Sequence, residues 1–361
     1  MRILFLAAYS ELAAASRIKV YQFLPELEKR GIKCNVICFT PSFVFKIRQA
    51  SVSNKKLLLV YYCLLYLIRP FKTILAILLA PRFDIVYIQE PIIPFGLEKL
   101  LKIVNKNIVF LFTDAVFLGP QKTDKFLERA RKKVLSKYWE RLSKVAVYCL
   151  VENDYNKEVV LKLCPNVEKI AGPMDTDKYL IKEYKKHSGP VIIGWVGTVF
   201  TSKYLYEIKS ALQNLAKKYD IILRVMEATK NFNIEGVVCE NKIWKKETEL
   251  DEVSSFDIGI MPLPYDEWTM GKGGFKLLQY MSLGVSAVAS PVGINKEIVS
   301  DGVNGFLAKN SEEWEEKLVK LIKDENLRRK IGERARATIE ERYSLQKATE
   351  KLLKIFNQIS K

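Results

Sequence analysis

Residues 270–284 read MGKGGFKLLQYMSLG, and a short apolar run follows at Ser286–Ala289. The glycines at the start predict a turn in which backbone N–H groups can approach an anion. A helix from about Phe275 to Leu283 would point the positive end of its dipole at the same place. Lys272 and Lys276 flank the helix start and can pair with phosphate oxygens. The segment favours a diphosphate-binding loop, but glycine-rich turns before helices are also common in purely structural roles.

The same alternation of apolar runs and amphipathic stretches extends along the whole chain, which is typical of parallel sheets with helical crossovers. The predicted strands of the first half are Ile3–Ala8, Cys34–Phe39, Ile85–Gln89, Ile108–Phe112 and Val145–Leu150. Those of the second half are Val191–Val196, Ile221–Met226, Ile258–Met261, Ser286–Ala289 and Gly305–Ala308. The expected fold class is α/β, with two doubly wound, Rossmann-like domains facing a cleft.

The chain length and a polar stretch that contains Gly and Pro suggest where the domains divide. The 361 residues suit two α/β domains of ~150–180 residues each. A polar stretch with Gly and Pro interrupts the pattern at 173–190, so we predict an N-terminal domain at 1–172, a linker at 173–190 and a C-terminal domain at 191–344. A last helix at 345–361 is expected to pack back on the N-terminal domain.

The net charge of +17 is unevenly shared. Residues 1–180 carry 29 Lys and Arg against 16 Asp and Glu, whereas residues 181–361 carry 29 against 25. Such a field attracts phosphorylated ligands, anionic lipid or nucleic acid. The six cysteines are scattered and indicate buried thiols in a reducing compartment. Met1 leads directly into an apolar strand, so we expect no secretion signal and a cytoplasmic location.

Several further motifs resemble those of the retaining glycosyltransferases of family 4, which have the two-domain GT-B fold. The segment QYMSLGVSAVAS at 279–290 is similar to the family pattern Glu-Ala-Met-Ala-x-Gly-x-Pro-Val-Val-Ala-Ser. Other similar segments are GPMDTDKY at 172–179, GWVGT at 194–198, FDIGIMPL at 256–263 and DGVNGFL at 301–307. The resemblance covers the C-terminal half in the family's order. It implies that 191–344 binds a nucleotide-sugar donor and that 1–172 faces the acceptor.

The resemblance also implies a set of donor-binding residues, with a UDP- or GDP-sugar as the donor and no required cofactor. These residues are Gly197, Thr198, Lys203, Ile243, Trp244, Gly271, Lys272, Gly273, Gly274, Phe275, Lys276 and Gln279. Ile243 and Trp244 would pass the nucleotide base, although Trp244 is equally consistent with a core or surface position.

Two departures from the family pattern concern the donor site. The family usually carries two glutamates with seven residues between them, and these positions hold Gly271 and Gln279 here. Gln279 can still bind the donor ribose, whereas a glycine has no side chain to contact the transferred sugar. Thr198 replaces an arginine of the family, and Lys203 keeps the family's lysine. This chain therefore resembles a subgroup in which Gly-Lys-x-Gly-x-Lys anchors the diphosphate.

The predicted mechanism follows from charge. Cleavage of a sugar–diphosphate bond builds negative charge on the leaving nucleotide, which Lys203, Lys272 and Lys276 would stabilise. No metal is expected, because no Asp-x-Asp signature lies near this site. The closest lookalike, Asp175 and Asp177, fits a capping role.

Three residues of the first half are candidates for the acceptor side. Arg17 opens the first helix and either meets a donor or acceptor phosphate or is an ordinary first-turn arginine. Asp114 follows the strand Ile108–Phe112, at the carboxyl end where α/β sheets place ligands. By resemblance it would orient the acceptor or act as a base. Glu90, after Ile85–Gln89, has a similar position.

The apolar stretch 55–83 has two interpretations. Leu57–Ile68 and Ile74–Ala80 are interrupted by Arg69-Pro70-Phe71-Lys72, and neither piece reaches the ~20 residues that cross a bilayer. With its flanking lysines and arginines, the stretch would either lie on an anionic membrane or pack on the first sheet.

The leading hypothesis is a glycosyltransferase, cytoplasmic or peripheral at the inner face of the cell membrane. It would move a sugar to a lipid-linked or saccharide acceptor in envelope polysaccharide or glycolipid synthesis. One alternative is a GT-B sugar-nucleotide epimerase, which needs a catalytic histidine, whereas the chain's single histidine, His187, falls in the predicted linker. Another is a basic nucleic-acid-binding protein, but no binding module for a specific nucleic acid is recognisable.

Overall fold

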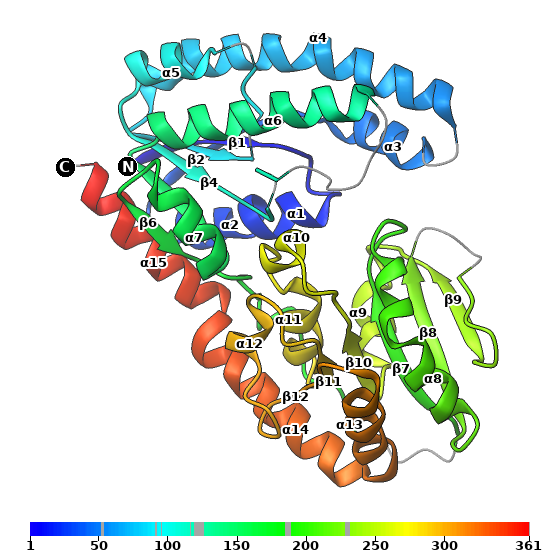
Figure 1. Ribbon diagram of the computed structural model, residues 1–361. Helices are drawn as coiled ribbons and strands as arrows, with labels where there is room; N and C mark the ends of the chain where they lie inside the picture. Colours follow the sequence, from blue (N-terminus) through cyan, green and yellow to red (C-terminus); the bar gives the residue numbers. More distant parts are fainter. Residues whose placement is uncertain are drawn as a thin grey trace. The chain divides into compact units, whose positions relative to one another are not determined.

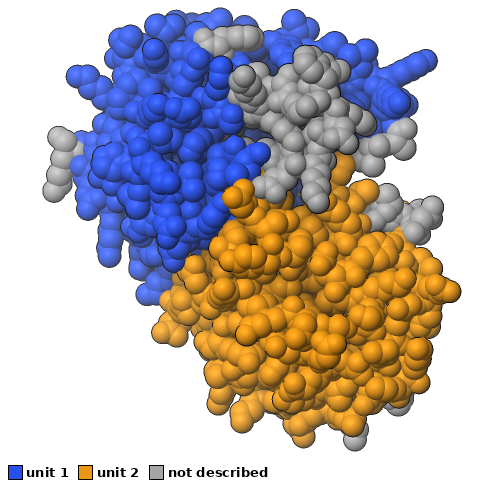
Figure 2. All heavy atoms as spheres, viewed as in Figure 1, with its two compact units in different colours: residues 1–173, 271–273, 345–361 blue, residues 174–270, 274–344 orange. Residues whose placement is uncertain are grey.

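The computed structural model describes residues 1–51, 54–90, 92–94, 96–115, 117–118, 126–184, 189–227 and 232–360; for 126–135 and 227 only the backbone is described. The chain divides into two units, coloured blue and orange in Figure 2. Unit 1 comprises 1–173, 271–273 and 345–361, and unit 2 comprises 174–270 and 274–344.

Unit 1 is a six-stranded parallel sheet with helices on both faces (Figure 1). The strand order is β2-β1-β3-β4-β5-β6. Its strands are β1 (Arg2–Ala7), β2 (Lys33–Cys38), β3 (Ile85–Gln89), β4 (Ile108–Leu111), β5 (Tyr148–Val151) and β6 (Val167–Lys169). Its helical segments are α1 (Ala14–Ser16), η1 (Arg17–Tyr21), α2 (Phe23–Glu28), α3 (Ser42–Ala50), α4 (Lys55–Leu79), η2 (Ala80–Arg82), α5 (Glu98–Val104), α6 (Phe126–Val145), α7 (Asp154–Leu161) and α15 (Leu345–Ile359).

The core of unit 1 follows the two-residue period of its strands. In β1, Leu4 and Leu6 face one layer, where they pack with Ala76 of α4 and other helical residues. Ile3 and Phe5 face the other layer, which α2 and α15 cover with Phe23 and Phe356 among others. Because both faces are covered, the inner strands β1, β3 and β4 are mostly apolar, which is why their positions were readable from the sequence.

Unit 2 repeats the architecture with a second six-stranded parallel sheet, in the order β12-β11-β10-β7-β8-β9. Its strands are β7 (Val191–Val196), β8 (Ile221–Glu227), β9 (Cys239–Ile243), β10 (Ile258–Met261), β11 (Ser286–Ala289) and β12 (Phe306–Leu307). Its helical segments are η3 (Ser202–Ile208), α8 (Lys209–Ala216), α9 (Glu249–Ser254), α10 (Glu267–Met270), α11 (Phe275–Ser282), α12 (Asn295–Ile298), α13 (Ser311–Lys323), α14 (Glu325–Thr338) and η4 (Ile339–Tyr343). The predicted fold class, two doubly wound α/β domains, is confirmed.

The chain passes between the units at Pro173–Met174 and at Ser344–Leu345. Part of the stretch predicted as a linker therefore belongs to unit 2, where the Lys182 N–H donates to the Leu283 carbonyl and the Tyr184 hydroxyl donates to the Gly284 carbonyl. Residues 185–188, including His187, lie outside the described residues. The helix predicted at the end of the chain is α15, and its apolar side belongs to the core of unit 1.

One local prediction is wrong. The sequence suggested two apolar pieces broken around Pro70, but α4 is a single helix of 25 residues that contains Pro70. A proline inside a helix removes one N–H donor and frees the carbonyl four residues earlier, here that of Tyr66. Tyr66 is 73% exposed, so water can satisfy that carbonyl. The Thr73 hydroxyl also donates to the Arg69 carbonyl at 2.8 Å.

Candidate functional site

The predicted donor-binding residues of unit 2 lie around the carboxyl end of β7. This strand is flanked by β8 on one side and β10 on the other, so the chain reverses its direction of strand addition there. Doubly wound sheets bind ligands in the crevice at such a switch point. Gly197 and Thr198 directly follow β7, and their backbones continue into η3.

Trp195 brings two of the predicted residues together. A Cβ built on Gly197 would lie 2.1 Å from the Trp195 ring, so only glycine allows the chain to turn over this ring. The Lys276 ammonium lies 5.2 Å from the centre of the same ring, a cation–π contact. The N-terminus of α11, which carries Lys276, is therefore held beside the turn that follows β7.

The start of α11 has the backbone that an anion site needs. Gly274 precedes the helix with φ 69°, a left-handed conformation that favours glycine, and no side chain caps this N-terminus. The first N–H groups of a helix lack internal partners and carry partial positive charge. Phe275 and Lys276, both half-buried, form the first turn. The Tyr280 hydroxyl accepts from the Val196 N–H at 3.1 Å and so anchors α11 to β7.

The remaining donor-side predictions occupy the rim of the same edge. Lys203 is exposed in η3, with its ammonium 5.5 Å from the centre of the Tyr204 ring. Ile243 ends β9 and is 48% exposed, and Trp244 follows it half-buried. Thr198 is exposed, and its N–H donates to the Thr201 hydroxyl. These positions leave the side chains of Lys203 and Ile243 accessible to a ligand.

Gln279 is buried beside a carboxylate, and its contact with the donor ribose stays a prediction. Its side chain is 1% exposed, and its Nε2 donates to Glu249 Oε1 at 3.0 Å. Glu249 begins α9 and is itself buried. The chain thus puts a carboxylate next to the amide that occupies the family's usual glutamate position. Sequence reasoning did not pair Glu249 with Gln279, because no sequence pattern links residues 249 and 279.

The glycine-rich loop 271–273 has a packing reason for its glycines. The loop belongs to unit 1, where Gly271 and Gly273 are buried and Lys272 is half-buried. A Cβ at Gly271 would lie 2.5 Å from Ala115 Cβ, and one at Gly273 would lie 2.6 Å from the Glu152 carboxylate. Both approaches exclude any side chain. The glycines are therefore explained by close packing as well as by the predicted approach to a phosphate.

At the carboxyl edge of the first sheet, two acidic residues have left-handed backbone conformations. Glu90 follows β3 with φ 63°, and Asp114 lies beyond β4 with φ 49°. Such conformations cost non-glycine residues of order 1 kcal/mol and concentrate at functional sites. Among the described residues, these are the only two non-glycine residues with positive φ. Two of the three positions predicted for the acceptor side are thus the strained non-glycine positions among the described residues of unit 1.

Electrostatics distinguish Glu90 from an ordinary surface carboxylate. Burial is the main cause that raises its pKa to about 7. The carboxylates of Asp114 and Glu152 raise this pKa further, whereas Lys19 and Arg69 oppose the rise. A carboxyl group with a pKa near 7 can exchange a proton at physiological pH.

Glu152 and Lys19 complete this cluster and were missed by sequence reasoning. Glu152 directly follows β5, is 4% exposed and forms an ion pair with Lys19 of η1. Burial raises the pKa of Glu152, and the Lys19 ammonium counteracts that effect. Polar residues directly after an apolar strand, here VEND at 151–154, were the available signal. Arg17 opens η1 and is half-buried, two residues before Lys19.

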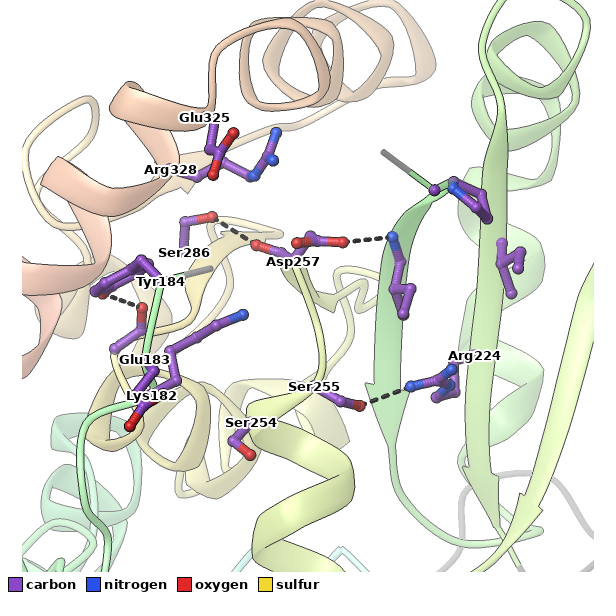
Figure 3. A pocket seen from close by; sticks show the side chains of 15 residues that line it. Lys182, Glu183, Tyr184, Arg224, Ser254, Ser255, Asp257, Ser286, Glu325 and Arg328 are labelled. Carbon is purple, nitrogen blue, oxygen red and sulfur yellow. Dashed lines mark hydrogen bonds between the residues drawn. The ribbon is translucent and has the colours of Figure 1, made fainter. Parts of the chain in front are cut away.

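A pocket in unit 2 lies at the opposite end of the second sheet (Figure 3). It is lined at the amino ends of β7, β8, β10 and β11. Its polar side chains already have partners: Arg224 donates to the Ser255 hydroxyl at 2.6 Å, and the Asp257 carboxylate accepts from the Ile192 N–H at 2.8 Å. Because doubly wound sheets bind ligands at carboxyl ends, we do not assign the donor to this pocket.

No three His, Cys, Asp or Glu side chains of the described residues are grouped so that they could hold a metal ion. The expectation that no metal is required stays a prediction.

Comparisons with known proteins find one family model and one curated relative that are similar to parts of this chain. The family model of the glycosyl transferases group 1 matches residues 177–338. An uncharacterised glycosyltransferase of Methanocaldococcus jannaschii, MJ1069, is 29% identical over 238 residues, which span 62% of this chain and 58% of that relative's length.

Solved structures share the fold over the full length. A glycosyltransferase from Rickettsia africae has a TM-score of 0.68 at 16% identity, covering 100% of this chain and 98% of its own. HepE of Anabaena has a TM-score of 0.64 at 14% identity, covering 99% and 100%. These structural likenesses show the GT-B fold. Residues 177–338 are similar to the glycosyl transferases group 1, the family that the motifs of the C-terminal half resemble.

Proposed function

We propose that this protein transfers a sugar from a nucleoside-diphosphate donor, a UDP- or GDP-sugar, with retention of anomeric configuration. One observation carries the proposal: the uncapped N-terminus of α11, with Lys276, is held over Trp195 beside the turn at Gly197. That arrangement offers backbone N–H groups and an ammonium at the switch point of the sheet. HepE, which shares this fold, was crystallised with UDP-glucose.

In the proposed reaction, the bond between the sugar C1 and the diphosphate oxygen breaks. The acceptor's hydroxyl oxygen bonds to C1, and its proton leaves with the diphosphate. Lys276 and the start of α11 stabilise the negative charge that develops on the leaving group. Glu90 and Asp114 are proposed to orient the acceptor hydroxyl.

A thermal-shift screen with UDP-, GDP-, ADP- and TDP-sugars tests the donor. A ligand that binds only the folded state raises the melting temperature, and a concentration 100 times Kd adds about 2.7 kcal/mol of stability. We expect one nucleotide class to raise the melting temperature of the wild-type protein and to lose this effect in Lys276→Ala. The proposal fails if none of the four nucleotide sugars shifts the transition.

We propose further that the acceptor is lipid-linked and that the protein works at the inner face of a membrane, as a peripheral protein. The support is α4, which is long and apolar enough to cross a bilayer. One side of it is packed: Tyr61 and Leu65 cluster with Val44 of α3, and Ala76 lies in the core of unit 1. A helix attached to its domain along one side lies on a membrane rather than through it.

The other side of α4 is apolar and exposed. Its large exposed side chains recur at helical spacing and are 45–73% exposed: Leu59, Val60, Tyr66, Leu67, Phe71, Ile74 and Leu78. Ile103 of the neighbouring α5 is 73% exposed. Residues 29–83 hold ten Lys and Arg and no Asp or Glu. An extended apolar face within an exclusively basic segment complements an anionic lipid surface.

Vesicle co-sedimentation tests the membrane proposal. We expect binding to phosphatidylcholine vesicles that contain phosphatidylglycerol, weaker binding to phosphatidylcholine alone, and loss of binding in Leu67→Glu/Phe71→Glu. Val238→Glu/Val303→Glu is the matched control, because these exposed apolar residues of unit 2 lie outside the basic segment. Wild-type binding by the α4 variant would contradict the proposal. Transfer to soluble saccharides alone, with none to lipid-linked acceptors, would contradict the lipid-linked acceptor.

A further inference from the structure

Two buried asparagines of unit 1 hold the carbonyls of the glycine-rich loop. Asn153 Nδ2 donates to the Lys272 carbonyl at 3.0 Å, and Asn156 Nδ2 donates to the Gly271 carbonyl at 3.1 Å. Both side chains are almost fully buried, at 1% and 0% exposed. A hydrogen bond out of water restrains its partners more strongly than a surface bond does. The backbone of the loop is thus held at two successive carbonyls.

Asn153 performs two tasks with one side chain. It precedes α7 as the N-cap, and its Oδ1 accepts from the Asn156 N–H at 2.8 Å. The amide is planar, so its Nδ2 then points away from the helix and reaches the loop. Aspartate would cap the helix equally well but has no N–H to donate. Asn156 lies in the first turn of the same helix, so the cap also positions the second asparagine.

The two bonds determine where the N–H groups of the loop point. In a planar trans peptide, the carbonyl of one residue and the N–H of the next point in opposite directions. Because the carbonyls of Gly271 and Lys272 point at the asparagines, the N–H groups of Lys272 and Gly273 point away from α7. These are two of the N–H groups that the sequence assigns to a diphosphate.

A negative charge beside the loop is compensated. The Glu152 carboxylate lies against Gly273, where it would repel a phosphate. Lys19 pairs with it, which removes most of that repulsion. The surroundings of the loop are therefore compatible with an incoming anion.

We propose that Asn153 and Asn156 are positioning residues for the donor: they orient the N–H groups of Lys272 and Gly273 toward the diphosphate. The inference rests on the proposed function and adds two residues that do not touch the donor themselves. The proposal predicts that the two asparagines affect only the contribution of the second phosphate to binding affinity. Loss of these two side-chain hydrogen bonds, which we call the clamp, weakens binding of a nucleoside diphosphate and leaves binding of the monophosphate nearly unchanged.

The test uses Asn153→Asp, which keeps the helix cap and removes the N–H donor. For the wild-type protein, the Kd ratio of UMP to UDP, or of GMP to GDP, measures what the second phosphate contributes. We expect this ratio to fall about tenfold in Asn153→Asp. A tenfold change in Kd corresponds to about 1.4 kcal/mol, which is the size of one lost hydrogen bond. Asn156→Ala, which removes the other donor, is expected to act in the same direction.

The matched control is Asn310→Asp at the N-cap of α13, whose side chain also accepts from an N–H three residues later, that of Glu313, at 2.9 Å. It should leave the ratio unchanged. An unchanged ratio in both Asn153→Asp and Asn156→Ala overturns the clamp if Lys276→Ala still lowers diphosphate affinity. A wild-type ratio near one, or an unaffected Lys276→Ala, overturns the proposed function instead.

Discussion

The carboxyl edges of the two sheets have the same architecture and opposite chemistry. The edge of the first sheet carries three carboxyl groups, those of Glu90, Asp114 and Glu152, and the edge of the second carries a glycine turn and lysines, including Lys203 and Lys276. Both edges follow a strand pattern that reverses direction at the first strand of the unit. The fold therefore determines where a ligand binds, and the residues just beyond the strands determine which charge it has.

The two edges also differ in how the backbone reaches its left-handed positions. At this edge of unit 2 the left-handed positions are glycines, such as Gly274, which adopts the conformation without strain. In unit 1, Glu90 and Asp114 keep side chains there. Glycine would relieve the strain at both positions. Backbone strain of this kind concentrates at functional sites, which favours a functional role for the two carboxyl groups.

The largest expected effect tests the lysines at the carboxyl edge of the second sheet. Lys276→Ala should weaken binding of the donor nucleotide by about 10- to 150-fold, because a charge-assisted hydrogen bond to phosphate contributes ~1.5–3 kcal/mol. Isothermal titration calorimetry measures the change. Lys320→Ala is the control, since that lysine pairs with Glu316 on the surface of α13. Equal affinities for the two variants would remove the contrast between the edges.

An intermediate effect tests the carboxyl groups at the edge of the first sheet through the pH dependence of stability. The pKa of Glu90 is raised, so its contribution to stability is fully present below about pH 4.5 and is lost as pH rises through 7. Glu90→Gln removes this loss. Because Glu90 is half-buried, solvent screening limits the expected gain in the free energy of unfolding to about 1 kcal/mol. The variant should therefore melt ~2–4 °C above wild type at pH 8 and at the same temperature as wild type at pH 4.5. A difference in melting temperature that does not change with pH would show that Glu90 titrates normally.

The smallest effect sharpens the argument from strain. Asp114→Gly should raise the free energy of unfolding by up to ~1 kcal/mol, since glycine adopts the left-handed conformation freely. Asp114→Asn should stay near wild type, because asparagine tolerates this region. Urea unfolding measures both variants. In both, the KM for the acceptor should rise if the carboxylate orients it; a KM that does not change would exclude Asp114 from the acceptor site.

Sequence reasoning located the buried strands and missed two of the four edge strands, β6 and β9. β7, β10 and β11 match their predicted bounds, because strands covered on both faces are continuous apolar runs. β6 has only three residues, VEK, and β9 reads CENKI, so neither contains such a run. Both lie at sheet edges, where one side needs no partner strand and polar residues are tolerated.

The site was predictable only as far as local patterns reach. The glycines, Lys276 and the residues after β7 belong to contiguous motifs, so the sequence indicated them. Glu249 beside Gln279, and Asn153 beside Lys272, are separated by 30 and 119 residues along the chain. Such pairings follow from packing, which no single motif encodes. The long helix through Pro70 was missed for a related reason, since the carbonyl that proline leaves free belongs to an exposed residue, Tyr66, which the local sequence does not reveal.

The last helix of the chain makes the order of synthesis matter. α15 covers the face of the first sheet that holds Ile3 and Phe5, and the Phe356 ring lies 6.5 Å from that of Tyr87. Yet the ribosome completes β6 long before it makes residue 345. At translation rates on the order of 5–20 residues per second, the intervening unit takes roughly 10–30 s to synthesise. Throughout that interval α2 alone covers this face of the nascent N-terminal sheet, and the apolar surface that α15 will bury stays exposed until residues 345–361 emerge.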